Sequence, residues 1–303
     1  FISPHSDRFV DETEERYWMA SGGVDLYVGG AEHAVLHLLY ARFWHKVLFD
    51  LGYVSGPEPF KKLVHQGLIL GENGQKMSKS LGNVVNPDDV VEEYGADAFR
   101  LFEMFLGPLE QMKPWSSRGI EGVFRFLDRT WRLFTDGGDG IASALLAEGM
   151  NQETELLLHK TIKKVTEDIE KMAFNTAISQ LMIFVNHVFS TRAIGRQAAE
   201  SFVLLLHPFA PHMAEELWQR LGKSNLSTES WPVADESKLQ DQLVEVVFQI
   251  NGKVRDKKAV SVDITPKELE ELARSSTVLA RYLEGKTPRK IVVVPGRLVN
   301  FVV

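Results

Sequence analysis

Five consecutive residues, Lys76-Met77-Ser78-Lys79-Ser80, carry side chains suited to binding a polyphosphate. Each lysine ammonium is a compact charge on a long flexible stem, so it can follow negative charge as it builds on a phosphate. A glycine-containing turn over residues 71–74 precedes them and predicts a flexible loop. The glycines stand at the wrong offsets for a P-loop. The pattern therefore indicates a phosphate-clamping lysine loop, and a merely solvated loop is the alternative.

Two short apolar runs predict the strands that would hold this loop. Val24–Val28 and Gly67–Leu70 are typical of buried parallel strands. Gly29-Gly30 ends the first run, and an apolar helix is predicted over Ala31–Leu51. Strand, glycine turn and helix together form one βα unit of a nucleotide-binding sheet. The second run leads directly into the lysine loop.

The middle of the chain predicts an antiparallel helical bundle. From about Ser117 the pattern is helical, and one apolar stripe has spacings of four, three, four and three residues. The stripe consists of Leu158, Ile162, Val165, Ile169 and Met172. A flexible inter-helix loop is predicted at Gly137–Gly140, and Pro208–His212 is predicted to end one helix and begin another.

The last sixty residues have a different pattern. Leu243–Ile250 and Lys253–Ile264 are predicted to pair through an Asn251-Gly252 type I′ turn. A helix starting at Thr265 and an apolar hairpin over residues 291–303 complete a small α+β domain. Residues 243–303 carry 11 Lys and Arg against 7 Asp and Glu, a net +4, although the whole chain carries −7. This basic tail is compatible with contacts to an RNA backbone.

Composition narrows the class of protein. The 303 residues are 44% hydrophobic and 25% charged, which is typical of a soluble globular protein long enough for two or three domains. No apolar run reaches the length of a membrane span, so no membrane partner is expected. The absence of cysteine excludes disulfides and thiolate metal sites.

The lysine loop is similar to the KMSKS signature of class I aminoacyl-tRNA synthetases. Other segments resemble the bacterial or organellar type of leucyl-tRNA synthetase, and the resemblance runs from about residue 17 to the end. The segments that carry it are residues 24–40, 64–70 (Val-His-Gln-Gly-Leu-Ile-Leu), 112–116 (Met-Lys-Pro-Trp-Ser) and 251–255 (Asn-Gly-Lys-Val-Arg).

The resemblance implies a multidomain fold in three parts. An α/β Rossmann-like remnant of the catalytic domain is expected over residues 1–115, an all-α bundle of the class I anticodon-binding type over 116–235, and the small α+β domain over 242–303. No HIGH-type motif and no inserted editing domain are found in the sequence. The chain is therefore expected to be a C-terminal fragment that is inactive alone, monomeric, and located in a bacterial cytoplasm or an organelle.

The implied activity is that of a leucine–tRNA ligase, which uses ATP and Mg²⁺ to activate leucine and transfers it to tRNA(Leu). The implied catalytic residues are Lys76 and Lys79. The implied ATP-binding residues are Gly29, Gly30, Glu32, His65, Gln66, Met77, Ser78 and Lys79. The implied leucine-binding residues are His33 and His37. The implied tRNA-binding residues are Lys113, Trp115, Arg118, Lys253, Arg255 and Lys290.

Structural roles remain open for several of these residues. His33 and His37 lie four apart, but a zincin places its Glu between the two histidines and here Glu32 precedes both, so no metal site is predicted. Lys113 and Trp115 could be a surface lysine and a core anchor, and the basic residues of the tail could protect strand edges. The alternative functions are a non-catalytic tRNA-binding module, or a class I synthetase for isoleucine, valine or methionine.

Overall fold

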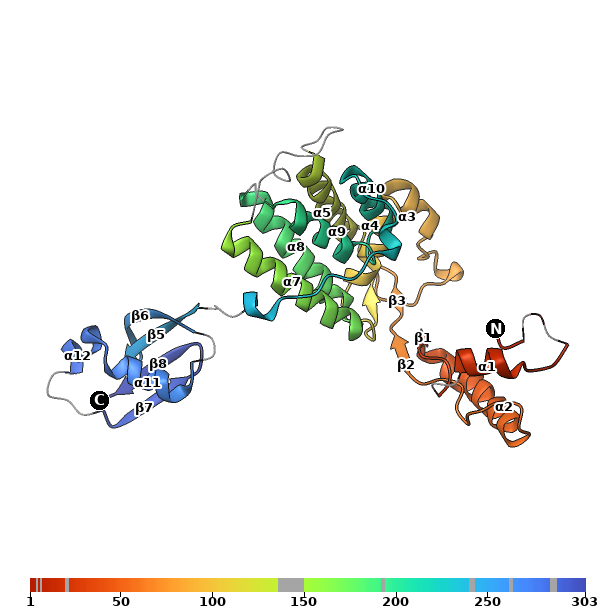
Figure 1. Ribbon diagram of the computed structural model, residues 1–303, viewed down its shortest axis with the longest axis horizontal. Coiled ribbons are helices and arrows are strands. Elements are labelled where there is room, and N and C mark those ends of the chain that lie inside the picture. Colours follow the sequence, from red (N-terminus) through yellow and green to blue (C-terminus); the bar gives the residue numbers. More distant parts are fainter. Residues whose placement is uncertain are drawn as a thin grey trace. The chain divides into compact units, whose positions relative to one another are not determined.

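The computed structural model describes residues 1–3, 5, 7–19, 22–135, 150–191, 194–239, 243–261, 264–283 and 288–303. The chain divides into two compact units, residues 1–233 and 234–303 (Figure 1). The loop predicted at Gly137–Gly140 lies outside the described residues. Within the described ranges, no helix combines the length and the apolar character needed to cross a membrane.

The first unit begins with short parallel strand pairs and their helices. The elements are α1 (Glu12–Met19), β1 (Tyr27–Gly30), α2 (Leu39–Asp50), β2 (Leu63–Gln66), β3 (Ile69–Leu70), α3 (Pro87–Tyr94), α4 (Ala96–Phe105) and β4 (Lys113–Pro114). β1 pairs with β2 and β3 pairs with β4, both in parallel. The strand predicted at Val24–Val28 is shifted: β1 begins at Tyr27 and continues through Gly29 and Gly30, which pair with His65 and Gln66. Val24 forms only an isolated bridge with Phe60.

The helix predicted over Ala31–Leu51 is continuous but not α-helical throughout. A 3₁₀ turn at Ala31–His33 and a π-helical turn at Ala34–Leu38 precede α2. π-Turns inside helices are uncommon and concentrate at functional sites. Much of the apolar surface of this run is uncovered in the structure: Val35 is 71% and Trp44 59% exposed.

A bidentate ion pair joins α2 to the segment that leads into β2. The Arg42 guanidinium donates two hydrogen bonds of 2.7 Å to the Glu58 carboxylate, and the Lys46 ammonium lies 2.9 Å from the same group. Hydrogen bonds from Arg42, and then from Lys46, lower the pKa of Glu58 to about 2. Because the folded pKa is lowered, this pair favours the folded state above the unfolded pKa, and the contribution disappears as the pH falls toward 2.

Replacing Arg42 with Gln should therefore raise the pKa of Glu58 toward the ordinary glutamate range. The pKa is measured by following the Glu58 carboxyl resonance in an NMR titration. Arg16→Gln is the matched control, since Arg16 is an exposed helix arginine whose ion pair with Glu12 is long, at 3.9 Å. A Glu58 titration that is unchanged in Arg42→Gln would contradict the assignment of the shift to this pair.

A buried carboxylate connects α4 to the helical bundle. Asp97, 9% exposed, accepts hydrogen bonds from the backbone N–H groups of His212 (3.3 Å) and Met213 (2.7 Å). Its Oδ1 also lies 2.8 Å from His212 Nδ1. Asp97 thus satisfies the free N–H groups at the start of α10 from another element, in place of a cap within that helix. The helix break predicted at Pro208–His212 is confirmed, because α9 ends at Leu206 and α10 begins at Pro211.

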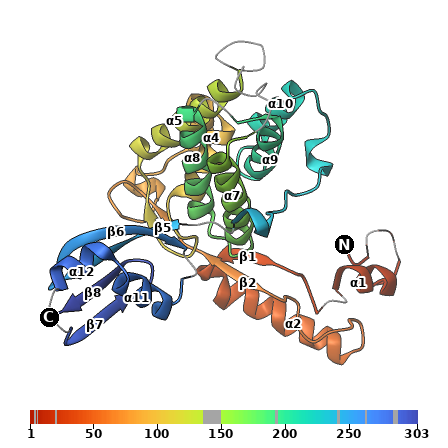
Figure 2. The same ribbon diagram turned by 60° about the vertical axis from the view of Figure 1, so that its left-hand side comes forward.

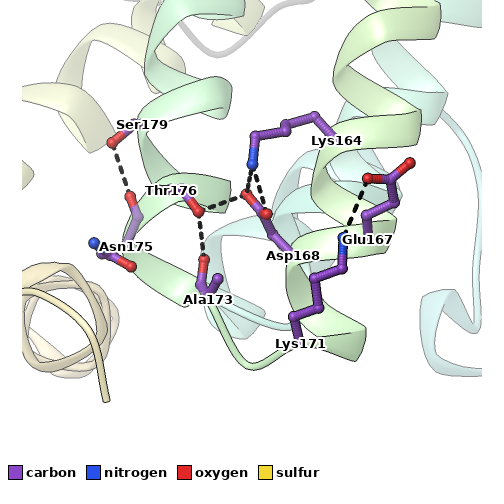
Figure 3. A network of polar contacts seen from close by, with 8 residues as sticks. All are labelled: Lys164, Glu167, Asp168, Lys171, Ala173, Asn175, Thr176 and Ser179. Atoms are coloured by element: carbon purple, nitrogen blue, oxygen red, sulfur yellow. Dashed lines mark hydrogen bonds and ion pairs between the residues drawn. The ribbon is translucent and has the colours of Figure 1, made fainter. Parts of the chain in front are cut away.

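The bundle contains α5 (Ser117–Thr135), α7 (Gln152–Glu170), α8 (Phe174–Thr191), α9 (Arg196–Leu206) and α10 (Pro211–Arg220). Leu158, Ile162 and Val165 are at most 4% exposed, which confirms these members of the predicted stripe. Met172 was predicted to continue the stripe, and this is wrong: α7 ends at Glu170, and Met172 adopts a φ of 55° in the turn to α8. In that corner the nearly buried Asp168 accepts hydrogen bonds from Lys164 on α7 and Thr176 on α8 (Figure 3).

The second unit is a four-stranded mixed sheet with two helices, α11 (Pro266–Arg274) and α12 (Thr277–Leu283), packed on it (Figure 2). The strands are β5 (Leu243–Ile250), β6 (Lys253–Ser261), β7 (Lys290–Val294) and β8 (Leu298–Val302), in the order β6-β5-β8-β7. Positive φ values at Asn251 (46°) and Gly252 (76°) confirm the type I′ turn. The second hairpin is also confirmed, whereas α12 and the parallel pairing of β5 with β8 were not predicted.

Candidate active site

The ends of β1 and β2 bring together the four residues predicted to lie around the nucleoside. In the parallel register, Gly29 is opposite His65 and Gly30 is opposite Gln66. Both pairs lie at the carboxyl ends of their strands, the edge at which open α/β sheets bind ligands. His65 also lines a cavity together with the turn at Pro108–Glu110 and the corner between α7 and α8. The strand pairing thus joins residues that are 36 positions apart in the sequence.

Glu32 and the two predicted leucine-pocket histidines follow directly after β1. The Glu32 carboxylate lies over Gly30, where it occupies the space that a Cβ would need. The His33 and His37 rings are 6.2 Å apart, and His37 is 5.6 Å from the Tyr27 ring. Tyr27 also packs 4.7 Å from Phe60. The histidines therefore belong to an aromatic cluster beside the glycine turn, in which Tyr27 and Phe60 were missed by sequence reasoning.

The lysine loop is an ordered turn that begins where β3 ends. Leu70 and Lys76 form an antiparallel bridge, and the turn between them is closed by a 2.8 Å hydrogen bond from Gly71 N–H to the Gln75 carbonyl. The loop then enters a 3₁₀ turn, Lys79–Leu81, capped by the Ser78 hydroxyl. Lys76 and Lys79 are both exposed, and within the described residues neither ammonium forms an ion pair. Their charges are therefore available to a ligand.

Two asparagines, Asn73 and Asn83, organise this loop and were missed by sequence reasoning. The Asn83 side chain accepts a 2.9 Å hydrogen bond from the Ser78 N–H and contacts the Lys76 carbonyl and Asn73. The Asn73 side chain accepts from the Gln75 N–H. Asparagine commonly stabilises turns in this way, so the positions of Asn73 and Asn83 beside glycines were a usable signal.

The three predicted tRNA contacts near β4 lie in different surroundings. The Trp115 side chain is 6% exposed, packs edge-to-face on Phe102 and donates a hydrogen bond to Ser117. This geometry favours the core-anchor alternative, since the buried ring has little surface on which a base could stack. Lys113 donates to the Gly107 carbonyl at 3.1 Å, and burial lowers its pKa. Only Arg118, in the first turn of α5, is exposed.

The predicted tRNA contacts of the second unit lie on opposite edges of its sheet. Lys253 and Arg255 belong to β6 and Lys290 begins β7, and these are the two outer strands. The Arg255 guanidinium stacks 4.3 Å above the Tyr282 ring. The sheet therefore does not gather the three residues into one patch, and protection of exposed edges remains an alternative role for them.

Among the described residues, no three His, Asp or Glu side chains are grouped so that they could hold a metal ion. Glu32, His33 and His37 are thus not arranged as a metal centre. Mg²⁺ that accompanies a nucleotide is usually bound by phosphates and water with only one or two protein carboxylates.

Two protein family models match successive parts of the chain. Residues 37–113, which run from α2 through the lysine loop to β4, match the family described as tRNA synthetases class I (I, L, M and V). Residues 152–271 match the anticodon-binding domain of tRNA ligase. The chain therefore carries a class I tRNA synthetase domain followed by a helical anticodon-binding domain.

Within this class, the chain is similar to a LeuRS of known structure. The ternary complex of Agrobacterium radiobacter K84 agnB2 LeuRS with tRNA and LeuAMS is 32% identical and matches 99% of this chain with a TM-score of 0.79. The chain spans 40% of the length of that LeuRS. The Mycobacterium tuberculosis methionyl-tRNA synthetase bound by methionyl-adenylate is 20% identical, over 68% of this chain and 45% of its own, with a TM-score of 0.49.

Proposed function

We propose that this chain is the C-terminal part of a leucyl-tRNA synthetase, whose substrates are leucine, ATP and tRNA(Leu). The observation that carries the proposal is the parallel pairing of Gly29-Gly30 with His65-Gln66. It is followed along the chain by β3, which forms a separate two-stranded sheet with β4 and leads into the lysine loop. The 32% identity to a LeuRS over nearly the whole chain supports leucine as the amino acid. The whole protein is proposed to act as a monomer in a bacterial cytoplasm or an organelle.

The proposed reaction has two steps. In the first, an oxygen of the leucine carboxylate bonds to the α-phosphorus of ATP, and the bond from that phosphorus to the bridging oxygen breaks, which releases pyrophosphate. In the second, a hydroxyl of the terminal tRNA ribose attacks the leucyl carbonyl and AMP leaves. Mg²⁺ would share the charge of the phosphates when bound with ATP.

Each of the candidate site residues has a proposed part in the first step. Lys79 stabilises the charge that develops on the phosphates, and Lys76 supports the leaving pyrophosphate. Met77 and Ser78 hold the nucleotide between them, and the glycine backbone admits the nucleoside where a side chain would block it. Glu32 accepts hydrogen bonds from the ribose, His65 and Gln66 lie near the adenine, and His33 and His37 form part of the leucine pocket.

Activity is proposed to need polypeptide beyond this chain. The chain spans 40% of the similar LeuRS, and the run from Val35 to Trp44 leaves large apolar side chains exposed. Exposed apolar area of this kind marks an interaction surface. The activity assay is therefore made on the full-length protein that contains this chain.

The test is leucine-dependent exchange of pyrophosphate into ATP, with isoleucine, valine and methionine as competing amino acids. We expect exchange with leucine, because the glycine turn, the histidines and the lysine loop together resemble the leucine enzyme. Exchange with another amino acid would overturn the proposed specificity. A folded protein that binds tRNA but shows no exchange would instead favour the non-catalytic tRNA-binding module.

A further inference from the structure

One carboxylate ties the lysine loop to the helical bundle. Glu72 lies in the turn between Leu70 and Lys76, and its Oε1 accepts hydrogen bonds from the Ser117 hydroxyl (2.6 Å) and the Ser117 N–H (3.1 Å). Ser117 is the first residue of α5. The Glu72 side chain thus supplies an acceptor to the free N–H groups at the start of that helix, from a segment 45 residues earlier.

Two further hydrogen bonds of Trp115 support the Glu72–Ser117 contact. The Ser117 hydroxyl also accepts a hydrogen bond from Trp115 Nε1 at 3.2 Å, and the Trp115 N–H donates to the Leu70 carbonyl at 2.8 Å. The bonds from Ser117 lower the pKa of Glu72, with a smaller contribution from the nearby charge of Arg118. The carboxylate is therefore ionised at neutral pH, and hydrogen bonds to an ionised acceptor are the stronger ones.

The position of Glu72 in the loop makes this tie relevant to the lysines. Glu72 precedes Lys76 by four residues, inside the turn that the Leu70–Lys76 bridge closes. The lysine ammoniums have no partner of their own that fixes them in the described structure, so their placement depends on the loop backbone. Asn83 accepts a hydrogen bond from Ser78 in the second half of the loop, and Glu72 joins the start of the loop to Ser117 of α5.

We propose that Glu72 is a positioning residue, whose bonds to Ser117 anchor the base of the lysine loop on α5 and so place Lys76 and Lys79. This inference rests on the proposed function for its catalytic consequence, but the anchoring itself can be tested on the chain alone. Because α5 is the first helix of the bundle, the tie also makes the loop sensitive to displacement of that helix.

The first experiment measures loop order by limited trypsin digestion of the chain, followed by mass spectrometry of cleavage after Lys76 and Lys79. In Glu72→Ala we expect cleavage at these sites to be faster by about fivefold or more, since local opening no longer has to break the tie. Glu92→Ala is the matched control, because Glu92 is an exposed glutamate on the nearby α3. Equal cleavage in Glu72→Ala and the wild type, at unchanged thermal stability, would overturn the anchoring.

Two further variants separate anchoring from a purely structural helix cap. Glu72→Gln keeps an oxygen that can accept from Ser117, so it should recover most of the protection. Ser117→Ala keeps the backbone donor and should be intermediate, and combining it with Glu72→Ala should add little, because both changes remove the same interaction. A lower melting temperature in Glu72→Ala with unchanged loop cleavage would show that Glu72 only caps α5.

The second experiment measures pyrophosphate exchange in the full-length protein. Misplacement of a catalytic group by about 1 Å can cost up to about a hundredfold in rate, so we expect the kcat of Glu72→Ala to fall by at least about tenfold. The KM for leucine should be unchanged, because the leucine pocket lies elsewhere. An active wild type and an equally active Glu72→Ala would overturn the positioning role alone. An inactive wild type would overturn the proposed function, and the cleavage result would still decide the anchoring.

Discussion

Replacing Lys79 with Ala should lower the kcat for pyrophosphate exchange by about 10² to 10³-fold, the usual effect of removing one donor that stabilises charge in a transition state. The Lys79 ammonium is exposed and has no ion-pair partner in the described structure, so it makes no visible contribution to the fold. The 3₁₀ turn that carries it is capped by Ser78 and held by Asn83, and neither contact involves the lysine side chain. The loss should therefore appear in the rate and not in the melting temperature.

The matched control for Lys79→Ala is Lys267→Ala, since Lys267 is an exposed lysine on α11. Pyrophosphate exchange does not require tRNA, so a lysine of the second unit should not affect it. Lys79→Arg should recover only part of the activity, because the planar guanidinium cannot reproduce the compact ammonium. An exchange rate in Lys79→Ala within twofold of the Lys267→Ala rate would remove Lys79 from the catalytic step. The proposal would then need Lys76 alone to support the pyrophosphate.

The parts of the fold that could be predicted from sequence are those fixed by local rules. Pro87 begins α3 because its missing N–H costs nothing at that position, and the Asn86 side chain accepts a hydrogen bond from the Asp88 N–H. Asn251-Gly252 forms the type I′ turn because both residues tolerate positive φ. The parallel pairing of β5 with β8 was missed because no local pattern encodes a partner about fifty residues away.

In the candidate site, too, local features could be predicted from the sequence and long-range contacts could not. The residue types of the lysine loop and the glycine turn are visible in the sequence, but the juxtaposition of the glycine turn with His65-Gln66 depends on the register of β1 with β2. The tie from Glu72 to Ser117 spans 45 residues and was not predictable. For Trp115 the sequence left two roles open, RNA contact and core anchor, and packing against Phe102 buries the ring and favours the second.

The largest expected loss of stability comes from Lys164→Met in the corner between α7 and α8. The Asp168 side chain is 5% exposed and accepts two hydrogen bonds from Lys164 (2.6 and 2.7 Å) and one from Thr176 (2.7 Å; Figure 3). Removing the ammonium would leave a buried carboxylate with a single side-chain donor. Breaking a fully buried pair typically costs about 3–5 kcal/mol in the free energy of unfolding. Because the Lys164 side chain is 47% exposed, we expect a smaller loss of about 2–3 kcal/mol here. Urea denaturation followed by circular dichroism measures the loss.

A control for this prediction lies one helical turn away in the same corner. Lys171 and Glu167 are also four positions apart in the sequence. Their Nζ and Oε2 atoms are separated by 3.5 Å, and their side chains are 68% and 45% exposed. Lys171→Met should therefore cost no more than about 1 kcal/mol, since exposed pairs contribute little. Adding Asp168→Asn to Lys164→Met should recover at least half of the loss, because an amide removes the unpaired charge and can still bond Thr176. Equal effects of Lys164→Met and Lys171→Met would show that water reaches Asp168 and that burial does not set the strength of this pair.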